Sequence, residues 1–316
     1  MPSSYLVTGG AGFIGSSIAR ALLKRGDKVR VLDNFFSGKR ENLADIAADI
    51  DLIEGDIRDT ATVARACAGV EVVFHEAAIP SVPRSLADPI SSNEVNIAGT
   101  LNVLHEAKKA GVRRLVFAAS SSAYGDTPTL PKIETMSPAP LSPYAVGKLA
   151  GEHYCAVFAG AYGLETVSLR YFNVFGARQD PKSEYAAVIP RFVTAGLAGQ
   201  GVTIFGDGTQ SRDFCYIDNT VEANLAAVTA PAAAASGRVF NVACGAATTL
   251  NEVVQLIGKT LGKTIPVTYA ERRVGDVKHS LADVSAARTN LGYKGTIDFA
   301  EGLRRTIAWY AERRSA

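Results

Sequence analysis

The residues TGGAGFIG at positions 8–15 decide the fold of this chain of 316 residues. They follow the apolar run 5–8 directly and open a segment of helical length. In such a turn Gly9 permits the tight bend, Gly12 lets the backbone approach a pyrophosphate, and Gly15 lets the helix pack on the strand. The spacing therefore predicts a strand, a glycine-rich turn and a helix that together bind a dinucleotide.

An acidic residue ends the second expected strand. Asp33 lies 18 residues past Gly15, where a carboxylate bonds the hydroxyls of an adenine ribose. The same carboxylate repels a 2′-phosphate, so the sequence favours NAD over NADP. Asp56, after the third expected strand, allows two interpretations: it caps the adenine, or it is only the N-cap of the helix that begins at Thr60.

Short apolar runs alternate with segments of helical length along most of the chain. Strands that alternate with helices form a parallel sheet with helices on both faces. The sequence therefore predicts an α/β fold, a Rossmann doubly wound parallel sheet with a smaller C-terminal α/β substrate-binding domain. The expected strands are residues 5–8, 28–33, 51–54, 70–76, 114–119, 166–171 and 238–243, and the expected helices are 14–25, 60–67, 89–110 and 143–162.

The pattern changes after about Phe175 to loops rich in Gly, Asp and Arg, followed by helices at 250–261, 285–291 and 301–312. We expect residues 1–174 to form an NAD-binding Rossmann domain and residues 175–316 to form the substrate-binding domain. Residues 213–243 are expected to rejoin the first domain, because 238–243 has the pattern of a strand that returns to the main sheet.

The composition argues against several classes of partner. A net charge of +2 with scattered basic residues gives no footprint for nucleic acid. No apolar run approaches the roughly 20 residues of a membrane helix, and the N-terminus has no secretory signal pattern. We therefore expect a cytoplasmic protein without a membrane partner. The cysteines lack metal-type spacing and predict buried thiols rather than a metal site or disulfides: Cys67, Cys155, Cys215 and Cys244.

One tyrosine has a lysine four residues further on, and Pro143 before it favours the first turn of a helix. This spacing puts Tyr144 and Lys148 on one helix face. A free phenol, with a pKa near 10, is a poor base at neutral pH. An ammonium about 5 Å away, at an effective dielectric constant of about 20, favours the phenolate by about 3 kcal/mol. The pair indicates a base that acts on an alcohol carbon beside a nicotinamide, although alone it could be a helix surface contact.

Together these residues resemble the extended short-chain dehydrogenase/reductase family of nucleotide-sugar enzymes, over essentially the full length. The resemblance is carried by the turn 9–15, by His75-Glu76-Ala77-Ala78, by Tyr144 with Lys148, and by residues 170–176. Longer runs at 81–85, 185–190, 211–219 and 275–280 are similar to those of the UDP-N-acetylglucosamine 4-epimerases within that family, which are relatives of UDP-galactose 4-epimerase.

The resemblance implies an NAD-dependent 4-epimerase of UDP-hexoses, which interconverts UDP-GlcNAc with UDP-GalNAc and UDP-Glc with UDP-Gal through a transient 4-keto sugar. Tyr144 then removes the proton of the 4-hydroxyl, and Lys148 tunes Tyr144 and holds the nicotinamide ribose. One serine of Ser120, Ser121 and Ser122 bonds the reacting oxygen; the family's position falls on Ser120. The NAD contacts implied are Gly9, Gly12, Phe13, Ile14, Gly15, Asp33, Asn34, Phe35, Ser37, Gly38, Asp56, Ile57, Ala77, Ala78, Asn96, Tyr144, Lys148, Tyr171 and Val174.

Two arginines, Arg212 and Arg273, suit a diphosphate because guanidinium forks match phosphate oxygens. Where 4,6-dehydratases carry an acidic pair, this chain has Ser121 and Ser122, which disfavours dehydration. Epimerases restricted to non-acetylated sugars have a bulky Tyr at the position of Ser280; a serine leaves room for a 2-acetamido group, or permits both sugars. The substrate contacts implied are Ser81, Arg84, Ser121, Asn173, Ala187, Val188, Ile204, Arg212, Tyr216, Arg273, Asp276 and Ser280.

Other readings stay open beside the 4-epimerase. The chain could be a decarboxylase, a uronic acid 4-epimerase or a reductase of a related nucleotide sugar; a non-catalytic nucleotide sensor is disfavoured because Tyr144 and Lys148 are both present. Pro80 stands where a glycine is expected before Ser81.

The resemblance also implies a homodimer through the helices 93–110 and 143–162, although core packing explains part of the same apolar pattern. The apolar residues concerned are Val95, Leu101, Leu104, Tyr154, Val157 and Phe158.

Overall fold

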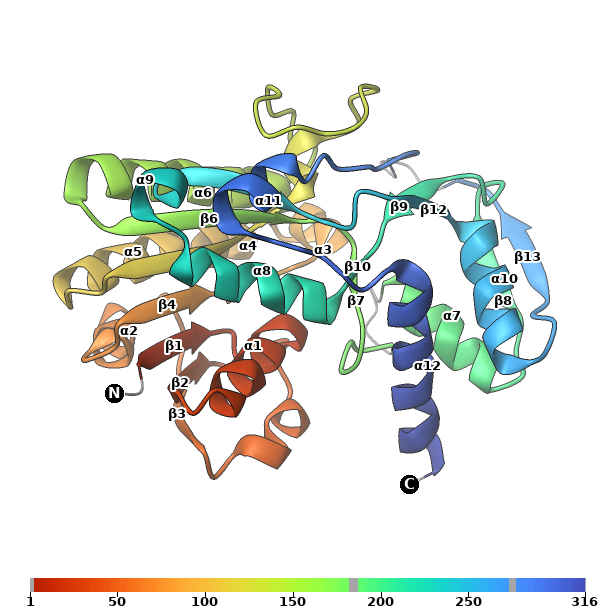
Figure 1. Cartoon of the computed structure of the whole chain (residues 1–316), viewed down its shortest axis with the longest axis horizontal. Helices are drawn as coiled ribbons and strands as arrows, with labels where there is room; N and C mark the ends of the chain where they lie inside the picture. Colours follow the sequence, from red (N-terminus) through yellow and green to blue (C-terminus); the bar gives the residue numbers. More distant parts are fainter. Residues whose placement is uncertain (1–2, 182–186, 273–276, 316) are drawn as a thin grey trace.

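The structure, a computed structural model, describes residues 3–181, 187–272 and 277–315. Its centre is a seven-stranded sheet in which all neighbouring strands are parallel (Figure 1). The strand order is β11-β6-β5-β4-β1-β2-β3, which is that of a doubly wound Rossmann sheet with one strand added beside β6. The strands are β1 (Ser4–Thr8), β2 (Lys28–Asp33), β3 (Ile50–Glu54), β4 (Val72–His75), β5 (Arg114–Ser120), β6 (Glu165–Tyr171) and β11 (Arg238–Val242).

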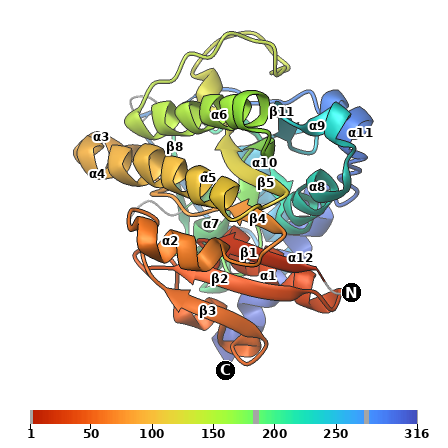
Figure 2. The same ribbon diagram turned by 90° about the vertical axis from the view of Figure 1, so that its left-hand side faces the viewer.

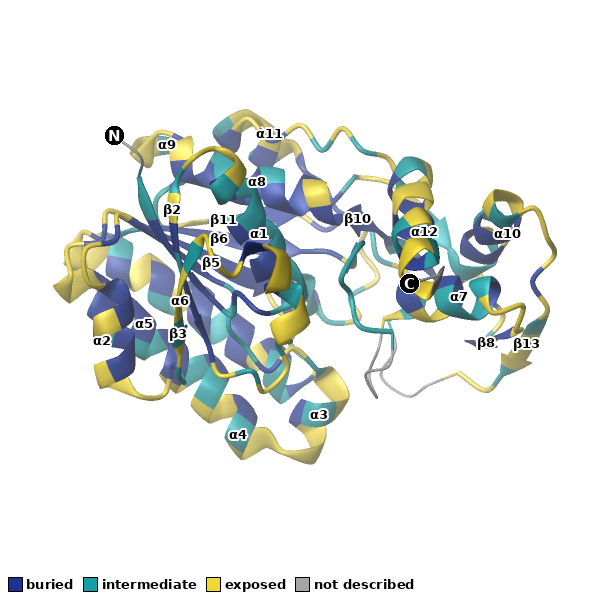
Figure 3. Cartoon of the chain, turned by 90° about the horizontal axis from the view of Figure 1, so that it is seen from below, coloured by how far each residue is buried: buried dark blue, intermediate teal, exposed yellow. Residues whose placement is uncertain are grey.

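Helices cover both faces of this sheet (Figure 2). One face carries α1 (Phe13–Lys24) and α8 (Ile217–Thr229), and the other carries α2 (Thr60–Cys67), α5 (Thr100–Lys109) and α6 (Pro143–Tyr162). Because successive strand residues point to opposite faces, β1 puts Val7 into one hydrophobic core and Leu6 into the other. Strands covered on both faces are apolar throughout rather than alternating. The central strands β1, β4, β5 and β6 are buried along most of their length (Figure 3), whereas the edge strand β3 is largely exposed.

A smaller layer lies beside the carboxyl ends of the strands, on the right of Figure 1. In it α7 packs against α10, and β8 pairs in parallel with β13. Two short pairs, β7 with β10 and β9 with β12, form further two-stranded sheets. The remaining elements are α3 (Val82–Ala87), α4 (Pro89–Asn93), β7 (Val174–Phe175), α7 (Val188–Leu197), β8 (Val202–Phe205), β9 (Ser211–Asp213), β10 (Cys215–Tyr216), α9 (Ala232–Ala235), β12 (Ala247–Thr249), α10 (Leu250–Leu261), β13 (Val267–Ala270), α11 (Ser285–Leu291) and α12 (Phe299–Ser315).

Local sequence sets the ends of the helix that carries the expected base. The Ser142 hydroxyl accepts a hydrogen bond from the Ala145 N–H, and Pro143 occupies the first turn of α6, where its missing N–H costs nothing. The helix ends at Gly163, whose φ of 67° is the left-handed conformation that glycine adopts without strain. The residues at 142–144 therefore begin α6 where the sequence predicted it.

The predicted architecture is confirmed, with small differences at the ends of elements. The expected helix 89–110 is α4 followed by a π-helical turn at 94–99 and then α5, and the strand expected at 70–76 is the shorter β4. Residues 238–242 pair with β6 in the main sheet, as their pattern predicted. Cys67, Cys155 and Cys215 are buried free thiols, whereas Cys244 is only partly buried. No helix of the described residues is long and apolar enough to cross a membrane.

Candidate active site

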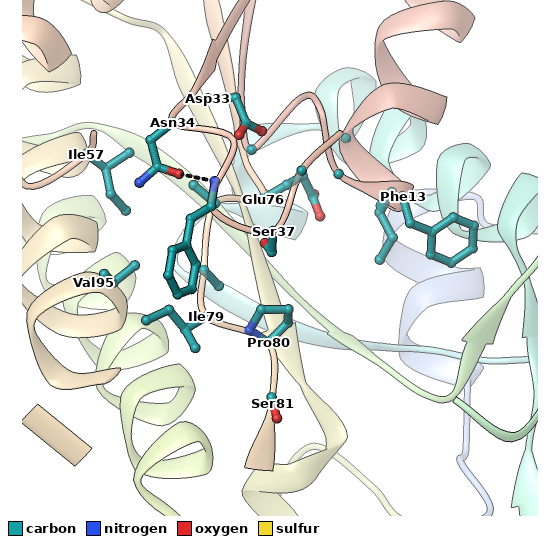
Figure 4. Close-up of a pocket in the computed structure, with 18 of the residues that line it drawn as sticks. Phe13, Asp33, Asn34, Ser37, Ile57, Glu76, Ile79, Pro80, Ser81 and Val95 are labelled. Atoms are coloured by element: carbon teal, nitrogen blue, oxygen red, sulfur yellow. Dashed lines mark hydrogen bonds between the residues drawn. The ribbon is translucent and has the colours of Figure 1, made fainter. Parts of the chain in front are cut away.

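A cavity of about 870 Å³ lies along the carboxyl ends of the central strands (Figure 4). Its walls include residues that directly follow β1 and β4 and residues that end β2 and β5. The strand order reverses between β1 and β4, and doubly wound sheets bind their ligands at this point. The predicted site residues that line the cavity are Gly9, Gly12, Phe13, Ile14, Gly15, Asp33, Asn34, Ser37, Gly38, Asp56, Ile57, Ala77, Ala78, Ser81, Arg84, Ser120, Tyr144, Tyr171, Val174 and Ala187.

The glycine-rich turn has no room for side chains. A Cβ on Gly9 would lie 2.6 Å from the Ala77 backbone nitrogen, and Gly9 has a φ of +68°. A Cβ on Gly15 would lie 2.3 Å from the Gly9 carbonyl oxygen. Gly12 precedes α1 without a side-chain cap, so the first N–H groups of α1, which have no partner within the helix, are left for a ligand.

The Asp33 carboxylate is fixed at the edge of the cavity. It accepts hydrogen bonds from the backbone N–H of Ala11 at 2.9 Å and of Phe35 at 2.8 Å. Burial raises the pKa of Asp33, and these two bonds oppose that rise. A Cβ on Gly38 would lie 2.9 Å from both carboxylate oxygens. The phosphate-binding turn and the acidic residue are therefore joined by hydrogen bonds on one wall.

Asp56 lies on the same wall and is not a helix cap. Its carboxylate accepts a hydrogen bond from the Asn34 side-chain amide at 2.8 Å and pairs with Arg58 at 2.9 Å. Arg58 holds the pKa of Asp56 below its usual value. The N-cap of α2 is Asp59, whose carboxylate accepts from the first N–H groups of that helix. The interpretation of Asp56 as a mere N-cap is therefore wrong, because Asp59 is the residue that lies directly before the first turn.

Tyr144 and Lys148 lie one turn apart on α6, against the end of β5. Tyr144 lines the cavity, whereas Lys148 is buried and donates a hydrogen bond to the Ala118 carbonyl at 2.6 Å. Burial raises the pKa of the Tyr144 phenol, and interaction with the Ser120 hydroxyl opposes that rise. Burial lowers the pKa of Lys148 to about 8. The pair is thus assembled, with the ammonium held by β5.

The three serines after β5 do not share one environment. Ser120 ends the strand and lines the cavity with Tyr144. Its Oγ accepts hydrogen bonds from the backbone N–H of Ser122 at 3.2 Å and from the Ser122 hydroxyl at 2.9 Å. Ser121 and Ser122 begin a 3₁₀ turn and are not among the cavity-lining residues. Ser120 is therefore the serine whose hydroxyl meets both Tyr144 and the cavity.

Other predicted residues lie away from the cavity wall. Asn96 is buried and bonds both backbone groups of Ile79, so it holds the loop after β4. The Ile204 and Tyr216 side chains are packed in the core. Arg212 donates to the backbone carbonyls of Ser211 and Lys278, and Asn173 is exposed. Phe35 and Val188 also do not line the cavity. Arg273 and Asp276 lie outside the described residues.

Glu76 lines the cavity although it was named only as part of a motif (Figure 4). Its carboxylate accepts a hydrogen bond from the Tyr171 hydroxyl at 2.8 Å. Burial raises the pKa of Glu76 to about 7. The signal that could have revealed it is its place directly after the fourth strand, at the edge of the sheet where the other site residues lie. Lys39, Arg178 and Asp180 are further lining residues that the sequence did not indicate.

This geometry is that of an α/β protein with a dinucleotide cradle and a tyrosine on the wall of the same cavity. The comparisons agree, since residues 5–243 match the NAD dependent epimerase/dehydratase family. The chain is similar to the UDP-N-acetylglucosamine 4-epimerase of Methanobrevibacter ruminantium, solved with UDP-N-acetylmuramic acid (41% identity, TM-score 0.93, covering 99% of this chain and 100% of that one). It is also similar to the UDP-glucose 4-epimerase of Thermotoga maritima, solved with UDP-glucose (37% identity, TM-score 0.93, covering 98% of this chain and 99% of that one).

A third similar structure is the UDP-glucose 4-epimerase of Thermus thermophilus, solved with NAD (38% identity, TM-score 0.88, covering 97% of this chain and 98% of that one). The chain therefore belongs to the NAD-dependent epimerase/dehydratase family of extended short-chain dehydrogenase/reductases, within its UDP-sugar 4-epimerases. The resemblance inferred from the sequence and the choice of NAD as cofactor are confirmed.

The residues of this chain fit the cofactor of the family. The cradle at Gly9 and Gly15, which a Cβ would fill, would hold the pyrophosphate at the start of α1. Asp33, fixed by two backbone N–H groups, would bond the adenine ribose. Tyr144 and Ser120 lie on the same cavity beyond this cradle.

Proposed function

We propose that the protein interconverts UDP-GlcNAc with UDP-GalNAc and also UDP-Glc with UDP-Gal, by inverting C4 of the hexose. The observation that carries this proposal is the shared position of two hydroxyl groups. Tyr144 on α6 and Ser120 at the end of β5 line one cavity and interact, with Lys148 buried one turn behind Tyr144. Such an arrangement can take a proton from an alcohol while the hydroxyl of Ser120 orients the oxygen.

NAD, when bound, supplies the redox chemistry by accepting the hydride of C4 and returning it within one turnover. Tyr144 takes the proton of the 4-hydroxyl, so that C4 becomes a ketone. Ser120 donates a hydrogen bond to the reacting oxygen in both directions. After the 4-keto sugar has turned over in the site, Tyr144 returns the proton to the oxygen on the inverted carbon. Tyr144 therefore begins and ends each turnover as the phenolate, because the same group acts first as the base and then as the acid.

The residues around Arg212 support the proposal that acetylated sugars are accepted. Its guanidinium donates to the Ser211 carbonyl at 2.9 Å and to the Lys278 carbonyl at 3.1 Å. The Ser280 N–H donates to the same Ser211 carbonyl at 3.1 Å. Ser280 thus lies beside the arginine proposed to hold the diphosphate, and its small side chain leaves room for a 2-acetamido group. Arg273 and Asp276 are proposed as further substrate contacts.

The test is the conversion of UDP-GlcNAc and of UDP-Glc in separate tubes, followed by proton NMR of the anomeric signals without added cofactor. We expect UDP-GalNAc to form at least as fast as UDP-Gal. The variant Ser280→Tyr should lose the acetylated reaction and keep the other. Turnover of UDP-Glc alone by the unchanged protein would contradict the argument from Ser280.

Two variants control this experiment. Tyr144→Phe removes the proposed base and should abolish both conversions, whereas Tyr162→Phe alters an exposed tyrosine at the end of the same helix and should not. If neither sugar turns over even with NAD supplied, a uronic acid 4-epimerase, decarboxylase or reductase becomes the better assignment. A reductase would change the nicotinamide absorbance in proportion to product, and an epimerase would not.

The domain division into residues 1–174 and 175–316, with 213–243 returning to the first, is kept as part of the proposal, as is a cytoplasmic location. A homodimer is proposed through α5 and α6, where the Val157 side chain of α6 is 52% exposed. Leu104 and Phe158 are not available for that interface, because they are buried in the core of their own chain. The molar mass in solution tests the dimer.

A further inference from the structure

Lys148 is a buried ammonium that forms no direct ion pair with any acidic residue that the structure describes. It is 4% exposed, and its Nζ donates to the Ala118 carbonyl at 2.6 Å and lies 5.0 Å from the centre of the Phe117 ring. Among the described residues no carboxylate forms an ion pair with it. Burying a charged ammonium is costly unless an opposite charge compensates it. Lys148 can therefore stay charged at this buried position only with an acidic group nearby.

Glu76 is the complementary case, a carboxyl group without a direct cationic partner among the described residues. It follows β4, lines the cavity and accepts a hydrogen bond from the Tyr171 hydroxyl at 2.8 Å. That hydroxyl in turn accepts from the Asn224 amide at 2.8 Å. The side chain of Glu76 is thus held by a network of neutral groups that reaches from β6 to α8.

The sheet register brings these two groups to the same edge. His75, the last residue of β4, pairs with Phe117 of β5. Glu76 directly follows β4, Ala118 is the next residue of β5, and Lys148 donates a hydrogen bond to the Ala118 carbonyl. The ammonium is therefore anchored to the strand position beside Glu76. The negative charge of Glu76 raises the pKa of Lys148, against the larger lowering by burial.

The other ionisable groups around the pair do not serve as the counterion. On α6, Glu152 is bound by Arg170 of β6 through two hydrogen bonds, at 2.8 and 2.7 Å. On β4, burial lowers the pKa of His75 to about 3, so His75 is neutral. Tyr144 and Tyr171 are phenols whose pKa burial raises. Cys155, also on α6, is a thiol whose pKa burial raises to about 12. Of the carboxylates around the pair within the described part of the chain, Glu76 is the one not already bound to a cation.

We propose that Glu76 is the counterion of Lys148, a positioning residue that keeps this buried lysine charged. The consequence for catalysis rests on the proposed function, since a charged Lys148 favours the phenolate of Tyr144. The pairing itself does not rest on the proposed function, because it concerns only the titration of Lys148 in the protein with its cofactor bound.

The test is the pH titration of Lys148, followed by carbon NMR of protein labelled at the lysine ε-carbon, with Lys148→Met assigning the signal. In Glu76→Gln, which can still accept from Tyr171, we expect the Lys148 pKa to fall by about one unit or more. Glu76→Asp should recover most of the original value. Glu71→Gln, at the opposite end of β4, is the matched control and should leave the value unchanged. An unchanged Lys148 pKa in Glu76→Gln overturns the proposal.

A second measurement covers the case in which Glu76→Gln does not fold. In Lys148→Met the loss of the positive charge should raise the pKa of Glu76, and the infrared band of a protonated carboxyl should persist to higher pH. A band with the same pH dependence as in the unchanged protein overturns the proposal. Where activity is present, the alkaline limb of kcat/KM in Glu76→Gln should move to lower pH together with Lys148. The absence of a Lys148 titration shift in Glu76→Gln would count against the pairing. A shift in the variant, together with no turnover of either UDP-sugar by the unchanged protein, would count against the proposed function alone.

Discussion

Lys39 and Asp180 form an ion pair of 2.7 Å across the wall of the cavity. Lys39 belongs to the loop after β2, and Asp180 lies in the segment after β7, so the pair joins two parts of the chain that are far apart in sequence. An epimerase needs its cofactor to stay bound through many turnovers. Both residues line the cavity whose other walls carry the expected NAD contacts.

Opening this pair should speed the loss of NAD rather than unfold the protein. We expect Lys39→Ala to release bound NAD faster, because a wall contact is removed. The free energy of unfolding should change by less than about 1 kcal/mol, since both side chains are partly exposed. The rate of NAD loss after gel filtration measures this. Asp51→Asn, which opens the surface pair with Arg30, is the control. Equal NAD loss in both variants would contradict the role given to Lys39.

A second prediction separates the cost of a positive φ from the cost of a clash between a Cβ and the backbone, by comparing Gly9 of the glycine-rich turn with Gly26. Gly9 has a positive φ, and a Cβ there would meet the Ala77 backbone at 2.6 Å; Gly26 has a φ of +81° with open space around it. Gly26→Ala should therefore cost only about 1 kcal/mol of stability from its backbone conformation. Gly9→Ala should cost more and should abolish NAD binding. Thermal unfolding and the NAD content of the purified variants measure this, and equal behaviour of the two would rule out the clash.

A buried ion pair gives a third prediction. Arg170 and Glu152 are 4% and 3% exposed at their side chains and are joined by two hydrogen bonds. Removing one partner leaves an uncompensated buried charge, so Glu152→Gln should destabilise the fold by about 3–5 kcal/mol. Glu71→Gln removes the partner of Arg113 at an exposed pair and should cost less than about 1 kcal/mol. Urea unfolding compares them; similar losses would mean that the buried pair contributes no more than a surface one.

Stability should fall in mild acid because of His75. Its ring nitrogens lie 2.7 and 3.0 Å from the hydroxyls of Thr8 and Thr100, and burial lowers its pKa to about 3. The unfolded chain binds the proton near pH 6.5, so the native state binds fewer protons below that pH. The contribution of neutral His75 is therefore complete above pH 6.5 and is lost as the pH falls towards 3. At pH 5 the loss is about 2 kcal/mol.

The measurement is urea unfolding at pH 7.5 and pH 5, with His75→Gln as the comparison. The variant should show a smaller decrease in the free energy of unfolding between these two pH values. A variant with the same decrease would mean that other groups cause the acid lability.

The sheet and its helices were predictable because their signals are local. The glycine turn, Asp33 and the Ser142-Pro143 start of α6 each depend on a few neighbouring residues. The short strands β7, β9, β10 and β12 were not predictable, because segments of two or three residues become strands only through their pairing partners.

In the candidate site, too, residues with a local sequence pattern were predictable, and residues whose environment depends on distant parts of the chain were not. Tyr144, Lys148 and Ser120 carry a sequence pattern, and the structure brings Tyr144 and Ser120 to one cavity. Glu76 was missed because its environment depends on Tyr171, 95 residues further along the chain. Ile204 was expected near the substrate, yet its side chain is 1% exposed in the core, because alternate residues of β8 point to opposite sides.

The most direct measurement uses UDP-GlcNAc with deuterium at C4 and the purified protein without added NAD. UDP-GalNAc should form with the deuterium still at C4, because hydride is taken up and returned inside the site. Product that has exchanged its C4 deuterium for a solvent proton would contradict the proposed mechanism, since C4 would then have been inverted by proton transfer.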